Sequence, residues 1–281
     1  MVNAMYPVLL TTPAHSAFMS RGEGRSKLDP TAPGWSPRTT GRDAPEAWSQ
    51  PEAWSQPVFI CERPEAWLQP RSSQHSGLLA KRPVHGRFDP YRAAIDDALE
   101  RFGDNAGLKT TVHHDGDQSH VLAKLKEPLD ALLAEAALPA VISRQLRSDA
   151  CTMSEVVASL CPSATKLDVK IEIFGENSCS RWHQDQYVGR GIISYTGKVG
   201  TDYTSDANVD FWELQNCGNN ACIIRDKRQI RSVDVGDFFF IKGTMFPGTN
   251  GLVHKSPEKR YHADGCVVNR LCLKVDLPSR F

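Results

Sequence analysis

The sequence has no surplus of charge of either sign. Its 281 residues contain 33 Lys and Arg and 33 Asp and Glu, so the formal net charge at pH 7 is zero. Binding to nucleic acid or to an anionic membrane needs a positive surplus, so neither is expected as a partner. No stretch approaches the 18 or so uncharged apolar residues that a transmembrane helix requires. With 40% hydrophobic residues, the composition is that of a globular protein.

The amino terminus lacks the features of a signal peptide. Its apolar run, residues 6–10, is too short and has no basic flank. The first acidic residue is Glu23, and a scarcity of acids is a property of organellar transit peptides. We therefore expect a cytoplasmic protein, with import into an organelle as the alternative.

No Cys-x-x-Cys pair occurs among the eight cysteines, so their spacing matches neither a zinc ribbon nor a disulfide framework. We expect reduced thiols, several of them acting as small apolar residues on strands. The cysteines are Cys61, Cys151, Cys161, Cys179, Cys217, Cys222, Cys266 and Cys272.

Proline is concentrated at the beginning of the chain. Twelve of the 18 prolines lie in the first 90 residues, where the hexapeptide 45–50 recurs at 51–56 and, with one change, at 64–69. Because proline interrupts helices and sheet ladders, residues 1–80 are predicted to be a disordered leader. The tryptophans of the repeats are either docking motifs for a protein partner or have no function. They are Trp48, Trp54 and Trp67.

Residues 81–164 are predicted to form a helical cap. Apolar residues recur at the helical period in 95–102, and the Leu- and Ala-rich segment 121–147 is interrupted by Pro128 and Pro139. That interruption favours two or three short helices, with a polar loop at 113–120 before them. Thr152 and Glu155 have the spacing of a capping box and predict the start of another helix.

Residues 165–281 change to the period of a strand. Val169, Ile171 and Ile173 alternate with Lys170 and Glu172, which is typical of a half-buried strand. Further strand-like runs follow, separated by glycine-containing turns, and together they predict a jelly roll. The expected fold is therefore α+β, with a cupin-like double-stranded β-helix as the carboxyl-terminal domain. The further runs are 191–195, 210–214, 221–225, 231–235, 237–242, 251–254 and 269–277.

One pattern in the jelly-roll region indicates a metal site. Two histidines and a carboxylate on one face are a common ligand set for non-haem Fe(II), and residues at i and i+2 of a strand point the same way. His-x-Asp occurs at 113–115, 183–185 and 262–264. Only His183 and Asp185 combine a strand context with a later histidine on another strand, His254. The predicted ligands are therefore His183, Asp185 and His254.

Each of these residues also has an ordinary structural interpretation. His183 alone could be a surface residue, Asp185 could cap a turn, and His254 could be a core histidine bonded to a carbonyl. The loop around His113, with His114, Asp115, Asp117 and His120, could bind a metal, although a solvated loop is the simpler interpretation.

Six blocks of the carboxyl-terminal region, in one order, resemble the DUF1826 family of uncharacterised proteins. The resemblance covers residues 165–278 and leaves out the leader. It implies no activity by itself. The blocks are 179–185, 190–197, 200–201, 235–243, 253–257 and 270–276.

The order of the blocks is also similar to that of jelly-roll Fe(II)/2-oxoglutarate dioxygenases. This resemblance implies that a basic residue after the distal histidine pairs with 2-oxoglutarate, a role for which Arg270 is preferred over Lys259 and Arg260. An arginine suits this role because its planar fork binds a carboxylate bidentately. Arg190 and Tyr195 are predicted to complete the pocket, although Tyr195 could equally fill the core. Lys242 either reaches solvent or faces the cavity.

The sequence therefore predicts an Fe(II)-dependent oxygenase that uses 2-oxoglutarate and acts on a small molecule or a peptide. The first alternative is a non-catalytic, cupin-like protein that binds zinc for homeostasis or sensing. The second is a scaffold whose tryptophan repeats bind a protein partner. Nothing in the sequence names the substrate.

Overall fold

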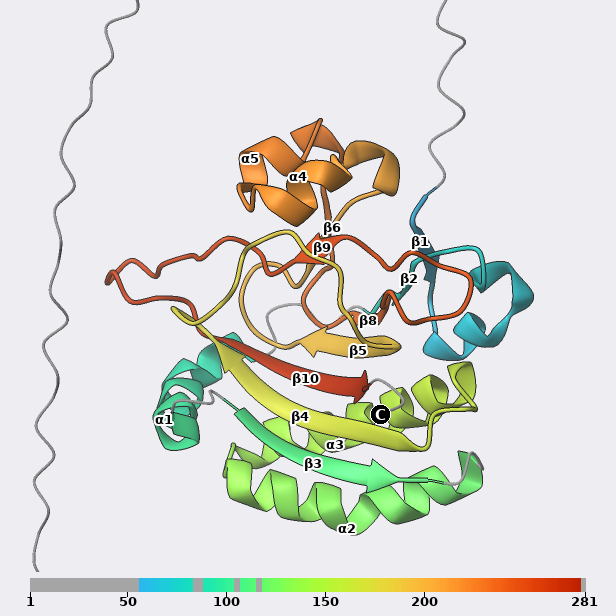
Figure 1. Cartoon of the computed structure of the whole chain (residues 1–281). Helices are drawn as coiled ribbons and strands as arrows, with labels where there is room; N and C mark the ends of the chain where they lie inside the picture. Colours follow the sequence, from blue (N-terminus) through green and yellow to red (C-terminus); the bar gives the residue numbers. More distant parts are fainter. Residues whose placement is uncertain (1–55, 83–87, 104–106, 115–117, 279–281) are drawn as a thin grey trace, which may run out of the picture. The chain divides into compact units, whose positions relative to one another are not determined.

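A seven-stranded sheet and a three-stranded sheet form the centre of the fold (Figure 1). The computed structural model describes residues 56–82, 88–103, 107–114 and 118–278. The large sheet has the order β1 (Val58–Cys61), β2 (Gly77–Ala80), β8 (Phe238–Lys242), β5 (Gly189–Ser194), β10 (Arg270–Leu277), β4 (Lys166–Phe174) and β3 (Gly107–His113). The small sheet consists of β7 (Arg231–Ser232), β6 (Asp202–Tyr203) and β9 (His254–Lys255).

The two sheets make a jelly roll. Strands β8, β5, β10 and β4 pair antiparallel and form one layer. In the opposite layer, β9 pairs with β6, and an isolated bridge between His183 and His254 adds a further strand position. The predicted jelly-roll fold is confirmed, as are the runs that became β4, β5, β8 and β10.

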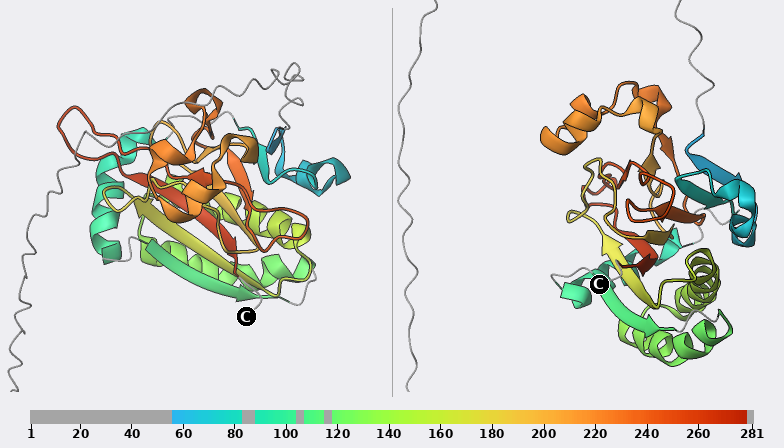
Figure 2. Two further views of the ribbon diagram at one scale, coloured as in Figure 1. Left: turned by 45° about the horizontal axis from the view of Figure 1, so that its top comes forward. Right: turned by 45° about the vertical axis from the view of Figure 1, so that its right-hand side comes forward.

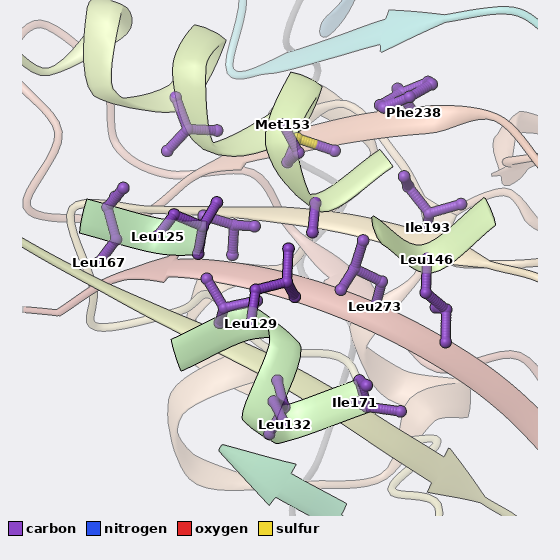
Figure 3. Close-up of a cluster of buried hydrophobic side chains, with 14 of the residues drawn as sticks. Leu125, Leu129, Leu132, Leu146, Met153, Leu167, Ile171, Ile193, Phe238 and Leu273 are labelled. Atoms are coloured by element: carbon purple, nitrogen blue, oxygen red, sulfur yellow. The ribbon is translucent and has the colours of Figure 1, made fainter. Parts of the chain in front are cut away.

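Three helices cover the outer face of the large sheet or its end: α1 (Arg92–Phe102), α2 (Gln118–Ala136) and α3 (Ala140–Leu160). In Figures 1 and 2, α2 and α3 lie on one side of the large sheet, and α4 and α5 lie on the other. In Figure 3, Leu125 and Leu129 of α2 and Met153 of α3 pack with Ile171 and Leu273 of the sheet. Odd-numbered residues of β4 and β10 therefore face the helices, and even-numbered residues face the small sheet.

The predicted helix boundaries are wrong in two places. Helix α2 runs through Pro128, because its buried leucines bind it to the sheet and outweigh the lost hydrogen bond. Thr152 lies inside α3, where its hydroxyl donates to the carbonyl of Ser148 at 3.1 Å instead of capping a helix. The cap also contains strand β3, so His113 ends a strand. Among the described helices, none has the length and apolar character needed to cross a bilayer.

Two of the predicted strands are helices. Residues 210–214 contribute to α4 (Phe211–Asn216), and residues 221–225 overlap α5 (Asn220–Ile223). The side chain of Asp210 accepts a hydrogen bond from the Glu213 amide at 3.1 Å, and that of Asn219 accepts one from the Ala221 amide at 3.0 Å. These N-caps provide hydrogen-bond acceptors for backbone amides that would pair with a neighbouring strand in a sheet. The prediction followed the apolar residues of these segments and missed the capping residues before them.

The predicted disorder of residues 1–80 is wrong for residues 56–80, which contain β1, β2 and a 3₁₀ helix, η1 (Pro64–Leu68). Pro57 precedes β1 and Pro64 begins η1, so neither proline interrupts a ladder. The third hexapeptide repeat is thus folded, and its Trp67 is fully buried against Phe240. A truncation at residue 80 would remove both strands. Trp48, Trp54 and the first two repeats lie outside the described residues.

Burial of Trp67 makes it a core residue instead of a docking motif. We expect Trp67→Ala to lower the free energy of unfolding by about 3–5 kcal/mol, because the substitution leaves a large cavity in the core. Urea denaturation followed by circular dichroism measures this change. The matched control is Trp212→Ala in α4, whose side chain is 67% exposed. An equal, small effect of both substitutions would contradict the assignment of Trp67 to the core.

Candidate metal centre

His183 and His254 lie opposite each other on neighbouring strands. The backbone amide of each donates to the carbonyl of the other at 3.0 Å. The residues before them, Trp182 and Val253, are buried in a separate apolar cluster. Because side chains alternate along a strand, the two histidines point to the opposite side, toward Asp185.

The three predicted ligands are brought together. Asp185 lies 3.7 Å from the Nε2 atom of His183 through one carboxylate oxygen and 3.7 Å from the Nε2 atom of His254 through the other. One ligand atom from each residue lies within 4.8 Å of the other two. A metal with bonds of about 2.1 Å holds neighbouring ligand atoms about 3 Å apart, so small side-chain rotations would close this group around one ion.

Hydrogen bonds fix which nitrogen of each ring faces Asp185. The Nδ1 atom of His183 lies 2.8 Å from the carbonyl of Arg181, and that of His254 lies 3.0 Å from the carbonyl of Leu252. A carbonyl only accepts, so Nδ1 carries the proton in both rings and the Nε2 lone pair is directed at Asp185. Burial lowers the pKa of His254 to about 4, although Asp185 acts in the opposite direction, so this ring is neutral near pH 7.

Asp185 is buried and held by Arg190. The Nη1 atom of Arg190 lies 3.0 Å from Oδ2 and donates to Oδ1 at 3.3 Å. Within the described part of the chain, Oδ2 accepts no hydrogen bond of its own. Two imidazole lone pairs and this oxygen therefore converge with no proton between them, an arrangement that a cation stabilises.

Arg190 is engaged by carboxylates of the protein. Its Nε donates to Asp276 at 2.7 Å, and Asp276 also forms an ion pair with Lys170 at 2.7 Å. Burial lowers the pKa of Arg190, but the charges of Asp276 and Asp185 outweigh it and the pKa is raised. The geometry therefore makes Arg190 a support for Asp185 instead of a free contact for a co-substrate.

Tyr195 and Lys242 lie on the helix side of the large sheet, away from the three ligands. The hydroxyl of Tyr195 donates to Asp149 of α3 at 2.7 Å, which agrees with the core interpretation. Burial raises the pKa of this hydroxyl. The ammonium of Lys242 donates to the carbonyls of Ser72 and Ser73, and burial lowers its pKa to about 8. Neither residue lines the metal centre, and Lys242 reaches neither solvent nor the cavity.

Arg270 does lie on the inner face of the sheet. It opens β10 opposite Phe174, and its guanidinium lies 5.7 Å from the centre of that ring. The side chain is buried, and its Nη1 donates to the carbonyl of Gly200 at 3.3 Å. Across the described ranges, no carboxylate pairs with it. Lys259, by contrast, is paired with Glu176 at 3.0 Å in the loop before β10.

The inner face carries charges that the alternating pattern did not reveal. Four charged side chains of β4 and β10 point between the two sheets and form two ion pairs there. Lys170 pairs with Asp276, and Lys274 pairs with Glu172. The pattern indicated a solvent-exposed face. The sequence did contain a signal for this burial, because two strand-like runs both carry charged residues at alternate positions. Opposite charges on adjacent strands can form cross-strand ion pairs.

The remaining His-x-Asp motifs form no comparable group among the described residues. Asp264 is paired with Arg92 at 2.9 Å, on the surface. His114 is buried, against the expectation of a solvated loop. Asp115 and Asp117 lie outside the described residues, so the alternative of a metal site in that loop is not tested.

A family model for proteins of unknown function, DUF1826, matches residues 91–276. The chain belongs to the DUF1826 family. The match spans the helices α1–α3 and the jelly roll, so the resemblance expected from the sequence blocks is confirmed. No curated protein matches this DUF1826 protein.

Solved structures similar to the DUF1826 protein include dioxygenases. The rice dioxygenase for auxin oxidation is 14% identical, with a TM-score of 0.39 over 76% of this chain and 77% of that chain. The Arabidopsis thaliana dioxygenase for auxin oxidation 1, in complex with 2-oxoglutarate, is 7% identical, with a TM-score of 0.42 over 77% and 88%. The Fe(II)/(alpha)ketoglutarate-dependent dioxygenase TqaL is 13% identical, with a TM-score of 0.39 over 75% and 85%. At these TM-scores the similarity says nothing about the activity of this chain.

Proposed function

We propose that the DUF1826 protein is an Fe(II)- and 2-oxoglutarate-dependent oxygenase in which His183, Asp185 and His254 hold the iron. The observation that carries this proposal is the convergence of two Nε2 lone pairs and one unbonded carboxylate oxygen on a single point. Two histidines and one carboxylate on one side of an ion leave coordination positions open, as non-haem Fe(II) oxygenases require.

Arg270 supports a dicarboxylate as the co-substrate. A buried guanidinium without a carboxylate partner is unfavourable, so an anion that enters this space is stabilised by it. Arg270 bonds to Gly200, which precedes Tyr203 by three residues, and Tyr203 pairs with His254. Arg270 is therefore bonded to the segment that leads into the strand beside His254.

The other residues of the site orient the metal ligands and shield the site from water. Arg190 holds the Asp185 carboxylate, and the two carbonyl-bound Nδ1 atoms keep both imidazole rings in the ligating orientation. Ile192, Phe239 and Ile241 belong to an apolar cluster inside the jelly roll that limits the entry of water. The side chain of His183 is 40% exposed, which leaves one side open to a small-molecule or peptide substrate. When bound, iron with 2-oxoglutarate and dioxygen supplies the oxidising chemistry.

Slow conversion of 2-oxoglutarate to succinate tests the proposal without a known substrate. We expect the purified protein to convert 2-oxoglutarate to succinate in air when Fe(II) and ascorbate are present. No succinate should form under nitrogen or when Zn²⁺ replaces the iron. Mass spectrometry of the products measures this. Tight binding of zinc, with neither succinate formation nor binding of 2-oxoglutarate to the iron form, would favour the metal-homeostasis alternative.

A further inference from the structure

A second group of ligating side chains lies on the hairpin formed by α4 and α5. Ligand atoms of Glu213, Cys217 and Cys222 all lie within 4.8 Å of one another. Figures 1 and 2 show this hairpin on the far side of the small sheet from the large sheet. The group is therefore separate from the His183, Asp185 and His254 centre, which faces the large sheet.

The local sequence builds this group. Glu213 and Cys217 are four residues apart in and just after α4, so they lie on the same side of the helix. Gly218 then turns the chain with a φ of 72°, a conformation that favours glycine. Asn219 caps α5 by accepting from the Ala221 amide, which places Cys222 back beside the end of α4. Two short helices and one glycine thus bring both thiols to one carboxylate.

The hairpin is held firmly against the strand that carries His183. The side chain of Asn220 accepts from the Trp182 amide at 3.1 Å and donates to the Ser180 carbonyl at 2.7 Å. Ile223 is fully buried and packs in one cluster with Trp182 and Val253. The ligands are therefore preorganised by a packed core, although both cysteines are themselves exposed.

The donor types of the group also suit a metal ion. Among the described residues, no ion pair involves Glu213. Two thiols and a carboxylate are a favourable donor set for a thiophilic metal, which replaces the thiol protons.

We propose that Glu213, Cys217 and Cys222 bind one thiophilic divalent cation of the zinc type. The Sγ atoms of the two cysteines and one carboxylate oxygen would supply three ligands, and a water molecule would complete a tetrahedron. Binding would release the two thiol protons to solvent. Because Asn220 ties the hairpin to Ser180 and Trp182, the bound ion stiffens the segment that leads directly to His183.

Titration with Co²⁺ under reducing conditions tests this site separately from the iron centre. The full chain with His183→Ala and His254→Ala should still take up one equivalent of Co²⁺ and develop a thiolate-to-cobalt charge-transfer band in the near ultraviolet. One equivalent of Zn²⁺ should displace the cobalt and remove the band. This result is expected whether or not the protein is an oxygenase, since imidazole and carboxylate ligands give no such band.

Adding Cys217→Ser and Cys222→Ser should abolish both the band and the equivalent of zinc. The matched control is Cys179→Ser with Cys266→Ser, because these exposed cysteines lie outside the group and should leave the band unchanged. Glu213→Gln should keep the band but require more Co²⁺ to saturate it. Circular dichroism checks that each variant is folded. Absence of the band in the reduced chain, or a band that survives loss of Cys217 and Cys222, would overturn the proposal.

Discussion

Replacing His254 with alanine is expected to abolish stoichiometric binding of Fe(II). His254 contributes one of three ligand atoms, and its side chain is buried, so no other group can move into its place from solvent. Loss of a residue that only orients a ligand lowers metal affinity about 10- to 100-fold, so loss of a ligand itself should exceed about 100-fold. His183→Ala should behave in the same way. Anaerobic titration followed by metal analysis measures the change.

Both variants should remain folded, because the jelly roll and its helical layer pack without a metal. The bridge between residues 183 and 254 uses backbone atoms, which alanine retains. The matched control is His262→Ala, which removes the histidine of another His-x-Asp motif in a surface loop and should bind iron normally. If His254→Ala binds one equivalent of Fe(II) as tightly as the unmodified protein, the assignment of the three ligands is wrong.

Replacing Arg270 with alanine should raise the apparent KM for 2-oxoglutarate by about 30-fold or more. Removing one member of a buried, charge-assisted pair costs about 2–5 kcal/mol, and each 1.4 kcal/mol corresponds to tenfold in affinity. The affinity for Fe(II) should change little, because Arg270 contacts none of the three ligands in the described structure. Arg270→Lys should restore only part of the affinity, since an ammonium cannot reproduce the planar fork.

The competing explanation is that Arg270 only stabilises the fold. A purely structural Arg270 would need an acidic partner such as Asp276 or Asp237. Both are engaged elsewhere: Asp276 with Arg190 and Lys170, and Asp237 with Lys81 at 3.0 Å. The matched control is Lys259→Ala, which removes a nearby cation that is paired with Glu176. A lower melting temperature with an unchanged KM in Arg270→Ala would exclude Arg270 from the co-substrate site.

The metal ligands could be predicted from sequence because their geometry is local. An i, i+2 spacing fixes His183 and Asp185 on one side of an extended segment, and His254 ends the only later strand-like run that contains a histidine. What the sequence could not supply is the pairing that aligns residue 183 with residue 254. For the same reason, the partners of Arg190 could not be predicted: Asp185 and Asp276 are 5 and 86 positions away in sequence.

The errors in the fold have a common cause, which is that burial depends on distant neighbours. Proline density predicted disorder for residues 56–80, yet Trp67 and strand β2 are held by Phe240 and β8 from the other end of the chain. Conversely, residues 210–214 and 221–225 were predicted as strands from their apolar content, while two side-chain caps determine short helices there. The alternation of apolar and charged residues in β4 was identified correctly. The sequence did not show that the second sheet covers the charged face.

The most direct test of the central claim is the visible absorption of the iron form under nitrogen. When 2-oxoglutarate is added to the Fe(II)-loaded protein, we expect a weak visible charge-transfer band that saturates at one equivalent of iron. The band should be absent in His254→Ala and should require a far higher concentration of 2-oxoglutarate in Arg270→Ala. An iron-loaded protein that develops no band, or a band of full intensity in His254→Ala, would contradict the account.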